Sequence, residues 1–195
     1  MSLLDIRTPY VEITAFYALN LPEYSMHPHR HPRCEIMYVT KGSCLIYVNE
    51  QDFCLKEQQF VFLKADVLHR LSIPKGRPCS ILNLEFSCLN SKTDISLSGL
   101  LAESPSFAGF AGCPGEYFTG DDTDHLGYSL KDLINQLRNG VPCKHDVRSL
   151  SEIYTPDQKC LIRLLFLRMM LELSKCVQSH SKNTGMLYLR RAQDY

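Results

Sequence analysis

Short runs in which apolar and polar residues alternate fill the first part of the chain, from Tyr10 to Phe86. Turn residues such as Lys41-Gly42-Ser43 and Asn49-Glu50 separate these runs, and residues 74–78 form a Pro- and Gly-containing loop. A succession of short strands with this punctuation is typical of a β-sandwich or a β-barrel. The predicted strands are residues 11–17, 33–40, 44–48, 51–55, 59–63, 69–73 and 79–86.

After Phe86 the hydrophobic period lengthens towards 3.6 residues, which indicates helices in the second half of the chain. One helix is predicted around residues 126–137, and Asn139-Gly140 followed by Pro142 would end it. We expect it to lie on the surface of the β-structure. Its apolar face consists of Leu126, Leu130, Leu133, Ile134 and Leu137.

A longer helix is predicted from Thr155 to about Val177. Thr155 can cap this helix, Pro156 suits its first position, and Gln158 completes a capping box. Its apolar residues form two stripes, so more than one side of the helix needs cover. The first stripe contains Ile162, Leu165, Phe166, Met169, Leu173 and Val177, and the second contains Leu161, Leu164, Leu171 and part of Arg168. The second stripe indicates either contact with a partner chain or a helix wholly buried in its own monomer, and both interpretations stay open.

Composition limits the classes of protein to which the chain can belong. At 195 residues and 45% hydrophobic, it can bury the core of one ordinary domain with helical additions. Its 21 Lys and Arg residues balance 21 Asp and Glu residues, so it lacks the basic field of a chain that grips DNA alone. Without an apolar run of membrane-spanning length or a signal-like N-terminus, we expect a soluble, cytoplasmic protein with no membrane partner. The nine cysteines, odd in number and without a Cys-x-x-Cys pair, indicate reduced core residues.

Three histidines and a glutamate have spacings that suit a metal-ligand set: His29, His31, Glu35 and His69. His29 and His31 would share one face of an extended strand, and His69 would come from a different strand. A straight strand would place Glu35 roughly 13 Å from His31, so the chain must bend between them, and Pro32 offers a site for the bend. Neutral imidazoles with one carboxylate suit a divalent zinc, iron, manganese or nickel ion with an open position. In the alternative, the histidines bind an organic effector or hydrogen-bond one another.

The same spacing resembles the first motif of the cupin family, with its His, His, Glu and Gly at His29, His31, Glu35 and Gly42. Of the second cupin motif only His69 is retained. Its Pro, Gly and Asn positions are occupied by Lys64, Asp66 and Ile73. The resemblance therefore keeps the complete ligand set but not the surroundings of the last ligand.

The order of segments resembles the N-terminal half of AraC-type transcriptional regulators. The residues that carry this resemblance are 31–42, Phe-Val-Phe-Leu at 60–63 before His69, and Arg-Arg-Ala-Gln-Asp-Tyr at 190–195. The resemblance implies a mainly β fold with C-terminal helices, in which a cupin-like barrel of jelly-roll type at residues 1–90 is followed by two or three α-helices. These helices, at residues 91–178, would pack on the barrel and dimerise. Residues 179–195 would form a polar linker and the start of a helix-turn-helix domain that lies beyond this chain.

The implied function is a non-enzymatic sensor that binds a small-molecule effector, forms a homodimer, and reaches DNA only through the domain beyond residue 195. Met37 and Val39 share the strand parity of Glu35 and are candidate ligand contacts. Further candidates for the ligand-binding wall are Tyr47, Phe62, Leu71 and Asn83. The candidate dimerisation residues are Leu161, Leu164, Arg168 and Leu171. The alternative is a metal-dependent cupin enzyme of dioxygenase or isomerase type.

Overall fold

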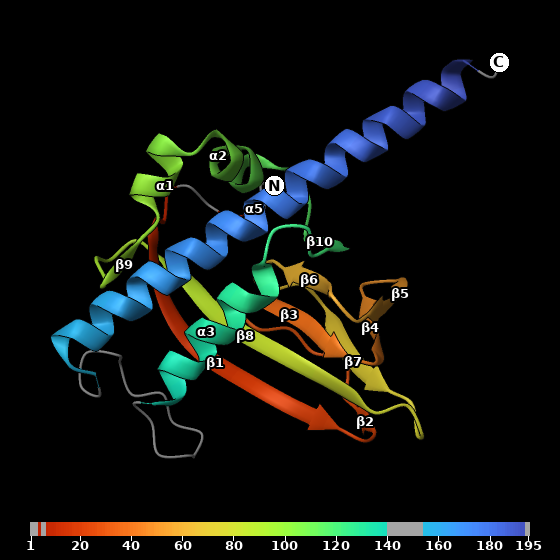
Figure 1. Ribbon diagram of the computed structural model, residues 1–195, viewed down its shortest axis with the longest axis horizontal. Coiled ribbons are helices and arrows are strands. Elements are labelled where there is room, and N and C mark those ends of the chain that lie inside the picture. Colours follow the sequence, from red (N-terminus) through yellow and green to blue (C-terminus); the bar gives the residue numbers. More distant parts are fainter. Residues whose placement is uncertain (1–3, 5–6, 140–153, 194–195) are drawn as a thin grey trace.

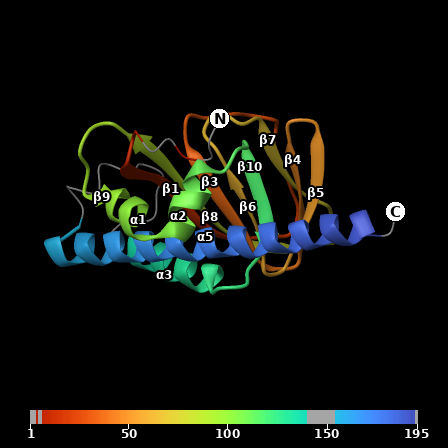
Figure 2. The ribbon, with the colours of Figure 1, turned by 90° about the horizontal axis from the view of Figure 1, so that it is seen from above.

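Two antiparallel β-sheets lie face to face, and helices cover the outer side of the larger sheet (Figures 1 and 2). The computed structural model describes residue 4 and residues 7–139 and 154–193. The larger sheet has the strand order β10 (Tyr117–Asp121), β6 (Gln59–Leu63), β3 (Cys34–Lys41), β8 (Cys79–Leu89), β1 (Tyr10–Leu21) and β9 (Ile95–Ser96). The smaller sheet has the order β2 (Tyr24–Ser25), β7 (His69–Ile73), β4 (Ser43–Val48) and β5 (Gln51–Lys56). The helices are α1 (Ser98–Glu103), α2 (Pro105–Gly112), α3 (Leu126–Arg138) and α5 (Pro156–Gln193).

All seven predicted strands are confirmed, several of them longer than expected, and both predicted hairpin turns are present. Gly42 has a φ of +80°, and a Cβ there would lie 2.3 Å from the carbonyl oxygen of Pro78. Asn49 takes the left-handed conformation at φ 54°, as a tight hairpin turn requires. The predicted cupin-like, mainly β fold is confirmed, although its two sheets do not join into a closed barrel, because β10 and β9 end the larger ladder and β2 and β5 end the smaller one. The fold is therefore a mainly β, two-sheet structure with C-terminal helices.

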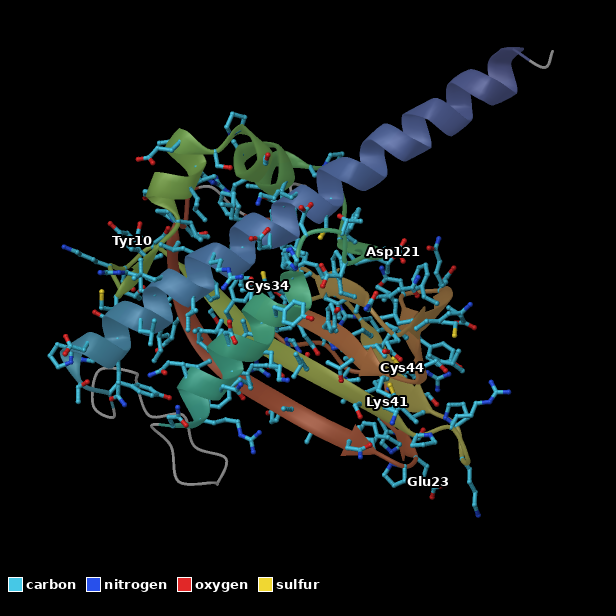
Figure 3. The ribbon with its side chains drawn as sticks, in the orientation of Figure 1. Tyr10, Glu23, Cys34, Lys41, Cys44 and Asp121 are labelled. Atoms are coloured by element: carbon cyan, nitrogen blue, oxygen red, sulfur yellow. The ribbon has the colours of Figure 1, made fainter. Side chains whose placement is uncertain are left out.

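Alternation along β3 separates two apolar cores. Cys34, Ile36 and Tyr38 face the layer between the larger sheet and the helices. Met37 and Val39 face the layer between the two sheets. Figure 3 shows the difference: Cys34 lies beneath the helices, whereas Cys44 of β4 lies in the smaller sheet, away from them. We call these layers the helix-side core and the intersheet core.

The prediction that helices follow Phe86 is confirmed, but it missed two strands. Strands β9 and β10 lie in the segment 91–178 and pair with β1 and β6 at the two edges of the larger sheet. The five residues of β10 include Gly120 and show no clear alternation, so period alone did not reveal them. Helices α1 and α2 were also not predicted, whereas α3 is confirmed. Gly140 and Pro142, which were predicted to end α3, lie outside the described residues.

Helix α5 begins as predicted but continues further. Its capping box is present, with Thr155 N–H donating to Gln158 Oε1 at 2.9 Å and Gln158 N–H donating to Thr155 Oγ1 at 3.3 Å. The predicted end near Val177 is wrong, since the helix runs through the polar segment 179–185 to Gln193. That segment contains no proline and a single glycine, so helical backbone there costs little. Its role as a linker stays a prediction, and residues 194 and 195 lie outside the described part.

The two stripes of α5 have different surroundings. Residues of the first stripe are buried in the helix-side core, where the Phe166 ring meets that of Phe86 edge-on at 5.3 Å between centroids. In the second stripe Leu161 and Leu164 are 43% and 56% exposed. The alternative of a helix wholly buried in its own monomer is therefore wrong. Within the described residues, no helix is apolar over a length that would cross a membrane.

Candidate metal and ligand site

Three imidazole rings gather at one end of the intersheet layer. The segment before β3 carries His29, whose backbone pairs with His69 at the start of β7 through two N–H···O bonds of 3.0 Å. The ring centroids of His29 and His69 are 4.4 Å apart, and that of His31 lies 5.5 and 5.1 Å from them. Their nitrogen ligand atoms lie within 4.8 Å of one another. The predicted juxtaposition of the three histidines is thus present in the structure.

The chain bends after His31, as the spacing required. Residues 31–33 are not part of a strand, and β3 begins only at Cys34. Asp66 N–H donates to the carbonyl oxygen of His31 at 2.8 Å and ties the β6–β7 loop to this bend. Asp66 itself has a φ of 65°. Because Asp66 stands where the cupin motif has glycine, the motif has lost the residue type but kept the left-handed backbone that glycine favours.

Each imidazole is oriented by a backbone carbonyl two residues away. The Nδ1 atoms of His29, His31 and His69 lie 3.2, 3.2 and 2.8 Å from the carbonyl oxygens of His27, Arg33 and Val67. A carbonyl can only accept, so Nδ1 carries the proton in each contact, which leaves Nε2 as the ring nitrogen that can face a metal or Glu35. Metal-binding histidines in proteins are commonly fixed by this kind of outer hydrogen bond.

Glu35 lies against two of these Nε2 atoms. Its Oε2 is 3.2 Å from His31 Nε2 and 3.1 Å from His69 Nε2, and its side chain is 5% exposed. Burial alone would raise the pKa of Glu35, but its contacts with His31 and His69 outweigh this and lower it to about 2. The carboxylate is therefore negative, and a positive charge must balance it: protons on the imidazoles or a metal cation between these atoms.

The donor set fits a divalent metal. His69 Nε2 is buried and, despite its distance to Glu35, is too poorly aligned for a hydrogen bond, so it finds no hydrogen-bond partner among the described residues. Three imidazole nitrogens and one carboxylate oxygen are ligands that zinc and first-row transition metals accept. His29, His31, His69 and Glu35 would hold the ion, which would supply a Lewis-acid position for a water or an organic ligand.

Three residues that the sequence reasoning did not assign complete the site. Glu85 of β8 stands directly across from Glu35 in the β3–β8 ladder, and a carboxylate oxygen of each lies within 4.8 Å of a His31 nitrogen. Arg33 Nε donates to Glu85 Oε2 at 2.5 Å. The pKa of Tyr17 in β1 is raised, mainly by burial and then by the charge of Glu85, and the opposing effect of Arg33 is smaller. The shared inward parity of Asn83 and Glu85 on one strand would have indicated Glu85.

The predicted ligand-wall residues divide between two places. Met37, Val39 and Leu71 lie in the intersheet core, and Asn83 is buried at the register position across from Met37. Phe62 instead lies in the helix-side core, where its ring meets Phe110. It was placed wrongly because neighbouring residues of β6 face opposite layers.

Tyr47 was also placed wrongly, for the same reason of strand parity. It is half-buried on β4, between the inward-facing Ile46 and Val48, and does not belong to the intersheet core. The guanidinium carbon of Arg70 lies 3.7 Å from its ring centroid. Tyr47 and Arg70 thus form a cation–π pair on the outer face of the smaller sheet.

A separate hollow of about 370 Å³ lies on the helix side of β3. It is bordered by Tyr38, by the β5–β6 turn, and by the first turns of α3. Its polar lining includes Glu57, His125 and Lys131. Because Tyr38 and Glu35 face opposite sides of β3, this hollow is distinct from the histidine site.

None of the curated proteins compared matches the chain significantly. A cupin protein from Bacteroides fragilis shares 16% identity over 40% of this chain and 69% of its own, with a TM-score of 0.36. YhaK from Escherichia coli shares 9% identity over 64% of this chain and 49% of its own, with a TM-score of 0.41. AerE from Microcystis aeruginosa shares 22% identity over 43% of each chain, with a TM-score of 0.35.

The family model described as the AraC-like ligand binding domain matches residues 14–141. The match begins within β1 and ends just after α3, so it includes every histidine and glutamate of the site. The chain therefore belongs to the AraC-like ligand-binding domain family.

Proposed function

We propose that this chain is the effector-sensing part of an AraC-type transcriptional regulator and that its effector binds at the histidine site between the two sheets. The observation that carries the proposal is the convergence of His29, His31 and His69, each with Nδ1 bound to a carbonyl, and the contact of Glu35 with His31 and His69. Barrel mouths and intersheet spaces with a few oriented polar groups are common sites for small ligands. In this proposal DNA is contacted by a domain outside this 195-residue chain.

A divalent metal is the second element of the proposal. It would replace the protons that otherwise balance Glu35, and it would leave an open position for an oxygen of the effector. Elemental analysis of tag-free protein is expected to find about one equivalent of a divalent metal per chain, the stoichiometry of a single four-ligand site. The double variant His31→Ala/His69→Ala is expected to lose the metal and the response to effector while it stays folded and dimeric. The exposed His125→Ala variant is the control, and its metal content is expected to match that of the wild type.

Self-association is the third element of the proposal. We propose that the exposed stripe of α5 binds the same stripe of a second copy of the chain. Leu161, Leu164, Arg168 and Leu171 follow one another at intervals of three, four and three residues, the a/d spacing of a coiled-coil seam. Leu161 and Leu164 are exposed, and Arg168 forms an ion pair with Asp132 of α3 at 3.7 Å. An apolar seam of this period on an exposed helix face is suited to an identical helix.

A metal-dependent enzyme is the competing function, because the same ligands would leave an open Lewis-acid position. Catalysis of a proton transfer would also require a free acid or base beside the metal. Glu85, the nearest additional carboxylate, is held by Arg33. Metal-loaded protein that binds its effector and releases it unchanged supports the sensor, whereas turnover by the purified chain supports the enzyme.

A further inference from the structure

We infer that the effector of this site is a small hydroxycarboxylate, whose carboxylate is bound by Arg33 and whose hydroxyl donates to Asn83. The inference rests on the proposed function, since it takes the ligand site to be the space beside the histidines. It follows from two polar groups that the protein leaves incompletely bonded on the inward face of the larger sheet.

Arg33 is the anion-receiving group. Its guanidinium uses only Nε in the described structure, to bind Glu85, while its side chain remains 35% exposed. The terminal Nη1 and Nη2 groups remain available, and their parallel N–H bonds match the two oxygens of a carboxylate. The pairing of Nε with Glu85, which is 11% exposed, fixes the orientation of the fork. Arg33 is therefore a preorganised carboxylate receptor next to the predicted metal position.

Asn83 supplies the second requirement. Its residue is 7% exposed, and its Oδ1 is buried without a hydrogen-bond partner among the described residues. An amide oxygen can only accept, so its partner must bring an O–H or N–H group. Asn83 lies two residues before Glu85 on the same face of β8, with Tyr17 directly across from it on β1. A buried acceptor left without a donor carries a desolvation penalty that a ligand hydroxyl would relieve.

The two requirements together select the ligand class. A neutral sugar would satisfy Asn83 but would leave the Arg33 fork unused, and a simple fatty acid would do the reverse. A hydroxycarboxylate satisfies both and also carries oxygen atoms that suit an open metal position. Arg70, by contrast, lies over the Tyr47 ring on the outer face of the smaller sheet.

Titration calorimetry of the full 195-residue chain, metal-loaded and metal-free, tests the inference with a defined panel of probes. The hydroxycarboxylates are lactate, malate, citrate and gluconate. The matched neutral compounds are lactamide and sorbitol, and the matched compounds without a hydroxyl are propionate and succinate. We expect at least one hydroxycarboxylate to bind about tenfold or more tightly than its neutral and deoxy counterparts, because each lost charge-assisted or buried hydrogen bond has an effect of this size.

Two variants with opposite expected effects on affinity distinguish a loss of ligand recognition from misfolding. Arg33→Gln is expected to weaken binding of the best probe by about tenfold, whereas Glu85→Gln is expected to strengthen it, since it removes a negative charge beside the anionic probe while the glutamine oxygen can still accept from Arg33 Nε. Asn83→Ala is expected to remove the preference for the hydroxy compound over its deoxy analogue. Arg70→Gln is the matched control and is expected to leave all affinities unchanged.

Three outcomes would overturn the inference. These are preferential binding of the neutral compounds, equal affinity of the wild type and Arg33→Gln for the best probe, or no binding of any hydroxycarboxylate by metal-loaded protein. The first two leave the proposed sensor function intact, because a ligand still binds. A chain that loses neither metal nor effector in the His31→Ala/His69→Ala variant would instead contradict the proposed function alone.

Discussion

The hydroxyl of Tyr38 donates a 3.0 Å hydrogen bond to Oδ2 of Asp122 and joins the larger sheet to the start of α3. The same carboxylate accepts the backbone N–H groups of Leu126 and Gly127, both at 2.9 Å. The side chain of His125, which directly precedes the helix, does not cap it, so the N–H groups of the first turn are satisfied by Asp122, which lies four residues before Leu126. Burial and the charge of Asp122 raise the pKa of Tyr38, which keeps its hydroxyl protonated as a donor.

Removal of this cap is expected to destabilise the fold. Asp122→Ala should lower the free energy of unfolding by about 1–2 kcal/mol, because helix N–H groups lose their acceptor. Tyr38→Phe should lower it by about 1 kcal/mol, the net effect of one hydrogen bond. Urea denaturation measures both. Asp52→Ala, on the exposed side of β5, is the control, and an equal loss of stability in that variant would contradict the assignment.

Gly127→Ala is expected to destabilise the protein although alanine favours helices. A Cβ at residue 127 would lie 2.4 Å from Cζ and 2.5 Å from the hydroxyl oxygen of Tyr38. The usual helix-propensity gain of about 1 kcal/mol is therefore reversed. Gly99→Ala in α1 is the matched control, because nothing lies within 4 Å of a Cβ there. A thermal midpoint that rises in both variants would show that Tyr38 does not pack as described.

The stability of the metal-free protein is expected to depend on pH through Glu35 and His69. Burial lowers the pKa of His69, but its contact with Glu35 outweighs burial and raises it above the ordinary value. Because the pKa of His69 is higher in the folded than in the unfolded protein, protonated His69 contributes its full stabilisation when the pH is below the unfolded-state pKa of about 6.5. This contribution is lost as the pH rises from there through the folded-state pKa. The lowered pKa of Glu35 acts in the opposite sense, and its contribution is lost only as the pH falls towards about 2.

Denaturation of chelator-treated protein between pH 5 and pH 9 measures this dependence, with His69→Gln expected to flatten it and His125→Gln expected to leave it unchanged. Metal affinity should change in the opposite direction and increase with pH, because protons compete for the same imidazole nitrogens. A metal affinity that is constant across this range would argue that the histidines are not ligands.

Charge on the exposed stripe of α5 is expected to weaken self-association. Leu161→Glu/Leu164→Glu should shift the sedimentation equilibrium towards monomer while the circular dichroism spectrum stays that of the wild type, since a glutamate at a coiled-coil seam is buried without a partner. Leu19→Glu on β1 is a control of equal exposure, 42% against 43% for Leu161. A dimer unaffected by the α5 pair but dissociated by Leu19→Glu would place the interface on the sheet.

Much of the site could be predicted because strand period and ligand chemistry are local properties of the sequence. His29 and His31 share parity, Pro32 marks the bend, and His69 starts a recognisable strand. Glu85 and Arg33 were missed because their pairing joins residues 52 positions apart. Only the register of β3 against β8 brings them together, and a register is set by the whole sheet.

Errors in the fold have a similar origin. Phe62 and Tyr47 were assigned to the intersheet layer, but parity in each strand depends on register that composition does not encode. Strand β10 is short and becomes extended through pairing with β6 rather than through its own propensity. Helix α5 was ended early because polar residues were read as a loop, although polar residues are compatible with a helix that continues beyond a packed core.

The length of α5 has a mechanical consequence. Val177 lies in the helix-side core, and the helix continues from it for roughly 24 Å to Gln193 at about 1.5 Å per residue. As Figure 1 shows, this part extends past the sheets, whereas the preceding part of α5 packs against the rest of the protein. A tilt of about 10° of this segment would move its end by roughly 4 Å. Side-chain adjustments too small to rearrange either sheet would thus be enlarged at the end of one helix.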